Sequence, residues 1–283
     1  MIHTLIIAKI SNVTKLERLR QRLARKKPRR AQAPAYPAGA ERMHLATLRA
    51  IHADVVEGIL VAFDRVVLRA DSVRNDGDGD EWARAKAYAR TAVNQHLGKI
   101  RQGFTRTADL GKRALTQAIG VPLVLEDPTL GALADDFVSR HVHYITRMTD
   151  EEIYDIGVMV REGTDSGLSY TELKRQVMDR TGVGRARAEL IARTEISSVN
   201  AEINKARFNE LGVTRAKWIT GKDARVRPAH RAMEGVEFDI NDPPHVGGGI
   251  DELGHKIPDE GSILPGQIWN CRCRMAPVID WLG

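Results

Sequence analysis

The chain has 283 residues, of which 42% are hydrophobic and 28% are charged, as in globular proteins with a substantial core. Aromatic residues make up only 5%, so aliphatic side chains must form most of that core. No run of 18 or more apolar residues occurs, which excludes a membrane-spanning helix as a predicted element. The first ten residues also lack the pattern of a secretory signal.

Positive charge is concentrated at the N-terminus. The net charge is +6 overall, but residues 1–50 contain twelve Lys and Arg against two acidic residues, a local charge of +10. A short helix from Thr14 to Lys27 and a proline-containing linker over 31–39 are predicted here. We expect this basic arm, residues 1–40, to bind double-stranded DNA without sequence preference. The predicted phosphate contacts are Arg18, Arg20, Arg22, Arg25, Lys26, Lys27, Arg29 and Arg30.

Residues 41–125 are predicted to form a helical region. Apolar residues recur at helical spacing from 41 to 70, and further helices are predicted from about 82 to 100 and on to Ile119. The segment Asn75–Asp80 reads as an exposed turn. A calcium loop is the alternative there, but it lacks a Glu at the twelfth position.

A second helical series is predicted from Pro128 onward. Thr149–Glu152 and Ser169–Glu172 both have the capping-box pattern, so each is expected to begin a helix. The glycines of Gly182–Gly184 are expected to introduce the longest helix, roughly 185–211, which Gly212 then ends.

The pattern changes after Gly212. Residues 213–220 are predicted to form a strand, and the segment 241–266, with six Gly and four Pro, a long loop or a set of short hairpins. The predicted fold class is therefore α+β. It combines a mainly helical N-terminal two-thirds with a small, loop-rich, β-containing C-terminal module.

Short motifs follow one another in order from the long helix toward the end of the chain. They comprise Arg193, Thr194, Glu195, Trp218, Asp223, Arg225, His230, Gly235, Trp269, Cys271, Arg272 and Cys273. In this order the set resembles the phage head morphogenesis, or Mu F-like, minor head protein family. The resemblance covers about residues 128–283, which we treat as a third predicted domain.

The resemblance implies a function in virus assembly. A protein of this family is expected to be a bacteriophage minor head protein that acts in head morphogenesis and in DNA packaging or ejection. Its expected partners are the phage portal protein, the inner capsid shell and double-stranded DNA, with no membrane. The expected location is the capsid interior of the virion, and the host cytoplasm during assembly.

The charged motif on the long helix needs partners. Arg193 and Glu195 lie beside an apolar stripe, and an unpaired buried charge costs several kcal/mol or so. We expect Asp223, Arg225 and Arg227 to pair with them. The motif is therefore interpreted as a structural latch between helix and hairpin, and no catalytic residue is assigned.

His230, Cys271 and Cys273 are the candidate metal ligands, and zinc is the metal that such residues favour. A fourth ligand is sought in His245 or His255. The C-x-C spacing of Cys271 and Cys273 departs from the C-x2-C that is usual in zinc sites. The resemblance implies a zinc knuckle in some relatives, which have Cys-x-x-Cys where this chain has Arg227–His230. Two interpretations stay open: a zinc site, or two reduced thiols that pack in the core.

An enzyme is the main alternative function. Asp223, His230, Cys271 and Cys273, with His245, are residue types that a metal-dependent nuclease or hydrolase uses. The sequence contains no nucleotide-binding glycine loop and no nucleophile motif, so an assembly protein is preferred. A cellular DNA-binding protein that acts through its basic arm is the third hypothesis.

Overall fold

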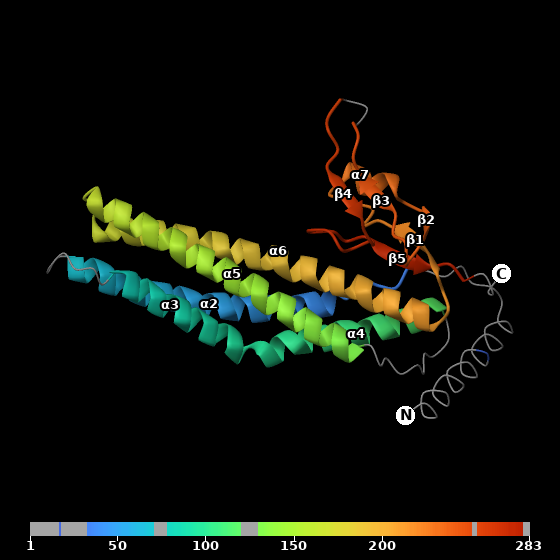
Figure 1. Ribbon diagram of the computed structural model, residues 1–283, viewed down its shortest axis with the longest axis horizontal. Coiled ribbons are helices and arrows are strands. Elements are labelled where there is room, and N and C mark those ends of the chain that lie inside the picture. Colours follow the sequence, from blue (N-terminus) through green and yellow to red (C-terminus); the bar gives the residue numbers. More distant parts are fainter. Residues whose placement is uncertain (1–16, 18–32, 71–77, 120–129, 251–253, 280–283) are drawn as a thin grey trace. The chain divides into compact units, whose positions relative to one another are not determined.

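The computed structural model describes residues 17, 33–70, 78–119, 130–250 and 254–279, and in these ranges long helices precede small strands (Figure 1). The helices are α2 (Ala38–Ala70), α3 (Asp78–Gln95), α4 (Leu97–Ile119), α5 (Leu130–Asp165), α6 (Tyr170–Glu210) and α7 (Pro228–Ala232). The strands are β1 (Arg215–Ile219), β2 (Glu237–Asp239), β3 (His245–Gly247), β4 (Asp259–Ser262) and β5 (Arg274–Pro277). The predicted α+β class, mainly helical, is confirmed. Among the described helices, none combines the length and apolar character needed to cross a bilayer.

The described chain divides into two compact units, each built from segments that are far apart in the sequence. The helical unit comprises 38–106 and 131–196. The strand-containing unit comprises the described parts of 1–37, 107–130 and 197–283. This division differs from the consecutive ranges 1–40, 41–125 and 128–283 expected from the sequence, because the ends of α4 and α6 share a core with the strands.

In the helical unit, α2, α3, α5 and the first part of α6 run alongside one another (Figure 1). The apolar stripe predicted for α2 is buried, with Ile51, Val55 and Ile59 each at most 1% exposed. On α5, the side chains of Phe137 and Ile153 are fully buried. Helical periodicity therefore predicted the inward face of α2 correctly.

Two predicted helix starts are wrong. α5 continues through Thr149, whose hydroxyl donates to the carbonyl of Thr146 (2.9 Å) within the helix instead of capping a new one. α6 likewise continues through Gly182–Gly184. Buried apolar residues on both sides, such as Val177 and Ala188 on α6, keep one helical face facing the core. Their burial outweighs the cost of about 1 kcal/mol for each glycine in a helix.

The helix start predicted at Ser169–Glu172 is confirmed. The backbone N–H of Glu172 donates to Ser169 Oγ (3.3 Å), so Ser169 caps α6. Gly163 has no room for a side chain, because an added Cβ would lie 2.4 Å from Leu173 Cδ2. Gly167 has φ = 76°, which glycine adopts without strain.

A buried pair of histidines joins α2 and α5. The Nε2 atoms of His44 and His141 are 2.6 Å apart, and neither side chain is exposed. His141 Nδ1 lies 3.3 Å from the carbonyl oxygen of Phe137 and 3.6 Å from Glu195 Oε2. Burial lowers the pKa of His44 to about 4. Burial, and after it the neighbouring His44, lowers the pKa of His141 well below its ordinary value.

The strand-containing unit has β1 at its centre. β1 pairs antiparallel with β2 and with β5, giving the order β2-β1-β5, and β3 and β4 form a separate hairpin. Gly212 (φ = 69°) ends α6, and the Val213 N–H donates to the Phe208 carbonyl (2.8 Å). The predicted stop and strand are therefore confirmed, and the glycine-rich segment does contain a short hairpin. Trp218 of β1 is fully buried in a core that also includes Leu115.

We predict that acid destabilises the helical unit through the histidine pair. An unfolded histidine binds a proton as the pH falls through 6.5, whereas folded His44 does so only near pH 4. The free energy of unfolding should therefore fall between these pH values, by up to about 1.4 kcal/mol per pH unit for each histidine. Urea unfolding from pH 7.5 to 4.5 or so measures the slope.

Two variants test this assignment. The double variant His44→Gln and His141→Gln should show a shallower slope than the wild type. The control His143→Gln alters an exposed histidine on the same helix and should keep the wild-type slope. Equal slopes in all three proteins would contradict the assignment, because carboxylates would then account for the whole acid response.

Candidate functional site

His230 lies on α7, a short helix that begins with Pro228. Proline at this position preorganises the first turn, since its missing N–H has no partner within the helix. The imidazole of His230 is 2% exposed, and the Trp218 ring meets it edge-on with the ring centres 5.4 Å apart. The ring is therefore fixed in place by the core.

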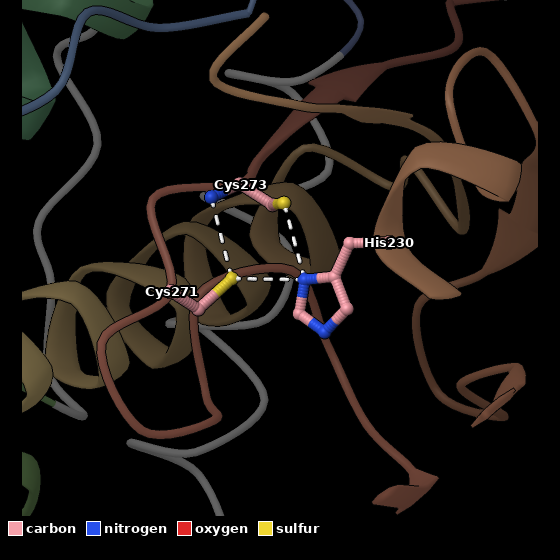
Figure 2. Close-up of side chains that lie close together, drawn as sticks. All are labelled: His230, Cys271 and Cys273. Carbon is pink, nitrogen blue, oxygen red and sulfur yellow. Dashed lines mark hydrogen bonds between the residues drawn. The ribbon is translucent and has the colours of Figure 1, made fainter. Parts of the chain in front are cut away.

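Cys271 and Cys273 lie just before β5, and their side chains are on the same side of the backbone. They follow a turn at Asn270, which has φ = 59°, and both are buried. His230 Nδ1 lies 3.3 Å from Cys271 Sγ and 3.4 Å from Cys273 Sγ (Figure 2). These three donor atoms all lie within 4.8 Å of one another. The structure thus brings together the three residues that the sequence analysis selected as metal ligands.

Glu260, on β4, is the functional neighbour that the sequence analysis missed. One of its carboxylate oxygens is hydrogen-bonded to His230 Nε2, and the other accepts from Arg227 Nη1 (3.2 Å). Arg227 Nη2 also donates to the carbonyl of Trp269 (2.7 Å). Because the carboxylate holds Nε2, Nδ1 is the nitrogen that faces the sulfurs. The sequence places Glu260 among many acidic loop residues, and no spacing distinguishes it from them.

The charges in this cluster are coupled. A hydrogen bond from Cys273, and less strongly one from His230, lowers the pKa of Cys271 to about 5 against the effect of burial. The hydrogen bond to Cys271, burial and the charge of Cys271 raise the pKa of Cys273. Burial lowers the pKa of His230, but Cys271 and Glu260 together outweigh it and raise the pKa. Contacts within the cluster thus lower the pKa of one thiol and raise the pKa of the other thiol and of the imidazole.

The remaining C-terminal motif residues surround this cluster or shape the turns that lead to it. Asp223 accepts from Arg272 Nη2 (2.5 Å) and from the backbone N–H of Arg225 (3.0 Å), and the Arg272 contact is the main cause of its lowered pKa. Gly235 has φ = 78° and its N–H donates to the Trp218 carbonyl (2.8 Å). The side chain of Trp269 is 46% exposed.

The partners expected for the helix motif were wrong. Arg193 Nε lies 3.3 Å from Glu41 Oε1 of α2, and Glu195 faces His141 of α5. Thr194 donates to the carbonyl of Leu190 in its own helix (2.9 Å). The motif therefore connects α6 to other helices of the helical unit. The expectation failed because its partners are more than fifty residues away in the sequence, and proximity along the chain favoured the following loop.

Other expected ligands do not join the cluster. His245 is exposed and pairs with Asp259 Oδ1 (2.9 Å), and His255 is exposed, so neither supplies the expected fourth ligand in the described group. The predicted DNA contacts lie outside the described residues: Arg18, Arg20, Arg22, Arg25, Lys26, Lys27, Arg29 and Arg30.

The cluster is enclosed by protein. His230, Cys271 and Cys273 are 2%, 4% and 5% exposed. A metal-bound water or a nucleophilic sulfur must meet its substrate directly, and burial of this degree prevents that contact. The arrangement suits a structural site better than a hydrolytic one.

Comparison with known families agrees with the motif order. Residues 154–276 match the family described as Phage Mu protein F like protein. The resemblance seen in the sequence is thereby confirmed, and the matched range contains the helix motif, His230 and both cysteines.

The similar proteins are distant and longer. An uncharacterized protein of Haemophilus influenzae is 24% identical over 201 residues, which is 68% of this chain and 42% of that protein. The NAD(+)–arginine ADP-ribosyltransferase EFV of Enterococcus faecalis is 24% identical over 173 residues, or 59% and 34% of the two chains. The minor head protein GP7 of Bacillus phage SPP1 is 28% identical over 141 residues, or 48% and 44%. The chain thus spans less than half the length of these relatives. No solved structure matches it.

We predict that Glu195→Ala destabilises the protein. Glu195 is 7% exposed, and its loss removes a buried acceptor next to His141. The expected cost is about 1–3 kcal/mol, which is typical when a buried polar group loses its partner. Urea unfolding monitored by circular dichroism measures this loss.

The matched control is Glu189→Ala on the same helix. Glu189 forms an ion pair with Arg49 in which both side chains are more than 40% exposed. Exposed pairs contribute about 0–1 kcal/mol, so this variant should unfold nearly as the wild type does. A Glu195→Ala protein with wild-type stability would instead indicate that the motif recognises another molecule.

Proposed function

We propose that this protein is a bacteriophage minor head protein that acts in head morphogenesis. The observation that carries the proposal is the family match over residues 154–276, supported by the similarity to the minor head protein GP7. The buried motif residues fit this role, because within the described ranges they contact neighbouring helices or strands and are themselves enclosed. In this proposal the protein is part of the virion.

The finer part of the proposal concerns DNA and the portal. The N-terminal arm, with a local charge of +10 over residues 1–50, is suited to a polyanion. Packaged double-stranded DNA is the polyanion that a protein inside a phage head meets. We therefore place the arm on DNA during packaging or ejection, and the folded part against the portal protein or the inner capsid shell.

An enzymatic function is the second candidate, and one observation favours it: a relative carries the name of an arginine ADP-ribosyltransferase. The matched region is 34% of that protein, and the cluster of His230, Cys271 and Cys273 is buried. The two candidates separate in one assay. Purified protein incubated with NAD⁺ and an arginine acceptor, or with DNA and Mg²⁺ or Zn²⁺, should give no turnover.

Virion fractionation tests the assembly role directly. Particles induced from the source strain should contain the protein, and protease should digest it only after the heads are opened. Detection of the protein in the cell lysate and its absence from purified particles would reject the proposal. Retention on the strain's own portal protein in a co-purification would support the portal contact.

We predict that the arm binds DNA mainly through phosphate contacts. The triple variant Arg18→Gln, Arg20→Gln and Arg22→Gln should bind duplex DNA more weakly. If each arginine meets one phosphate, the slope of log K against log salt should become shallower by about 2.7. Fluorescence anisotropy with two unrelated duplexes measures the slope, and both duplexes should give the same value.

A charge-matched variant provides the control. Lys99→Gln, Arg106→Gln and Arg113→Gln remove three exposed cations from α4. This protein should keep the wild-type salt slope. An equal loss in both triple variants would show that net charge alone drives binding, and unchanged binding in the arm variant would exclude the arm.

A further inference from the structure

The donor atoms of His230, Cys271 and Cys273 have nearly the spacing that one tetrahedral metal ion requires. Zinc bonds of about 2.3 Å to sulfur and about 2.05 Å to nitrogen imply N–S separations near 3.6 Å at the tetrahedral angle. The observed separations of 3.3 Å and 3.4 Å from His230 Nδ1 are close to this value. The three side chains already point toward a common centre (Figure 2).

The chemistry of the donors selects the metal. Two thiolates and one imidazole are soft to borderline ligands, which suit Zn²⁺ and not the hard cations Ca²⁺ or Mg²⁺. Zn²⁺ would bind both sulfurs as thiolates and His230 as neutral imidazole, so its positive charge would offset the two negative charges of the sulfurs.

Neighbouring residues form hydrogen bonds to the three candidate ligands, as is common around zinc sites. Zinc-bound histidines commonly use their second nitrogen to contact a carboxylate, and Glu260 occupies that position on Nε2. Arg227 in turn holds Glu260. The backbone N–H of Cys273 lies 3.4 Å from Cys271 Sγ and donates toward it. Trp218 Nε1 is a buried donor adjacent to Cys273, and a thiolate at Cys273 would accept a hydrogen bond from it.

We propose that His230, Cys271 and Cys273 bind one structural Zn²⁺ ion, with Glu260 as the positioning residue of His230. The three side chains supply three of the four ligands that tetrahedral zinc takes. Burial of the ligands gives the ion a structural role. The ion connects α7 to the segment before β5, which lies 41 residues further along the chain. It thereby stabilises a unit that is too small to bury a large hydrophobic core.

The same residues also suit a different arrangement, a catalytic triad of Cys271, His230 and Glu260 in which Cys271 is the nucleophilic thiolate. Such a triad needs an accessible sulfur and no metal, whereas the zinc site makes both sulfurs unreactive. Metal content and thiol reactivity therefore distinguish the two arrangements.

Metal analysis of the full chain, produced without a tag in zinc-supplemented medium, is the primary test. Elemental analysis should give about one zinc per chain in the wild type. Cys271→Ser, Cys273→Ser and His230→Gln should each lose it. The control His245→Gln alters an exposed histidine of the same unit and should keep it. Zinc-free wild type, or zinc retained when both cysteines are serine, overturns the proposal.

Cobalt substitution answers the question in the folded wild type. Co²⁺ exchanged into the protein should give a thiolate charge-transfer band and intense visible bands of tetrahedral coordination. Their absence overturns the proposal. So does rapid alkylation of Cys271 by iodoacetamide in the protein as purified, because a nucleophilic triad predicts it and zinc ligation prevents it.

The role of Glu260 has its own test. Glu260→Gln should still bind one zinc but with an affinity about 10–100-fold lower, as measured by competition with a metallochromic chelator. The control Asp259→Asn alters the adjacent, exposed carboxylate and should bind zinc as the wild type does. Equal affinities in Glu260→Gln and the wild type would reject the positioning role.

Discussion

The enclosed imidazole of His230 is the contact on which the strand-containing unit depends. Trp218 packs against its ring, Glu260 holds Nε2, and the two cysteines face Nδ1. These contacts come from β1, β4 and the segment before β5, so one side chain connects the β2-β1-β5 sheet to the separate β3-β4 hairpin. A small unit with short strands has little apolar surface to bury, and directed polar contacts compensate for this shortage.

The helical unit solves a similar problem in a different way. Its long helices bury continuous apolar stripes, and the buried polar groups within them meet in pairs, such as His44 with His141 and His141 with Glu195. Each pair joins two helices that are distant in the sequence. A buried polar group stabilises only the arrangement in which its partner is present, so these pairs select one packing of the helices among many.

Burial also connects structure to the proposed role. An assembly protein needs a rigid body that presents a surface and an arm, whereas a hydrolase needs reactive groups that a substrate reaches. The motif residues on the long helix and the His230 cluster are mostly interior. The basic charge of the chain, by contrast, lies in the arm. The two properties fit a protein that binds DNA with one segment and holds its position with another.

The sequence alone determined the local features of this protein: the helical face of α2, the cap at Ser169, the stop at Gly212 and the residue types of the cluster of His230, Cys271 and Cys273. Each depends on neighbours within a few positions, where periodicity and capping chemistry decide. Tertiary structure decided which partner each polar group meets. It continued α5 through Thr149, paired Glu195 with His141, and chose Glu260 over the other acids of its loop. Partners far apart in the sequence meet only when the burial of apolar residues has fixed how the elements pack. That packing depends on distant parts of the chain, so neighbouring residues do not predict it.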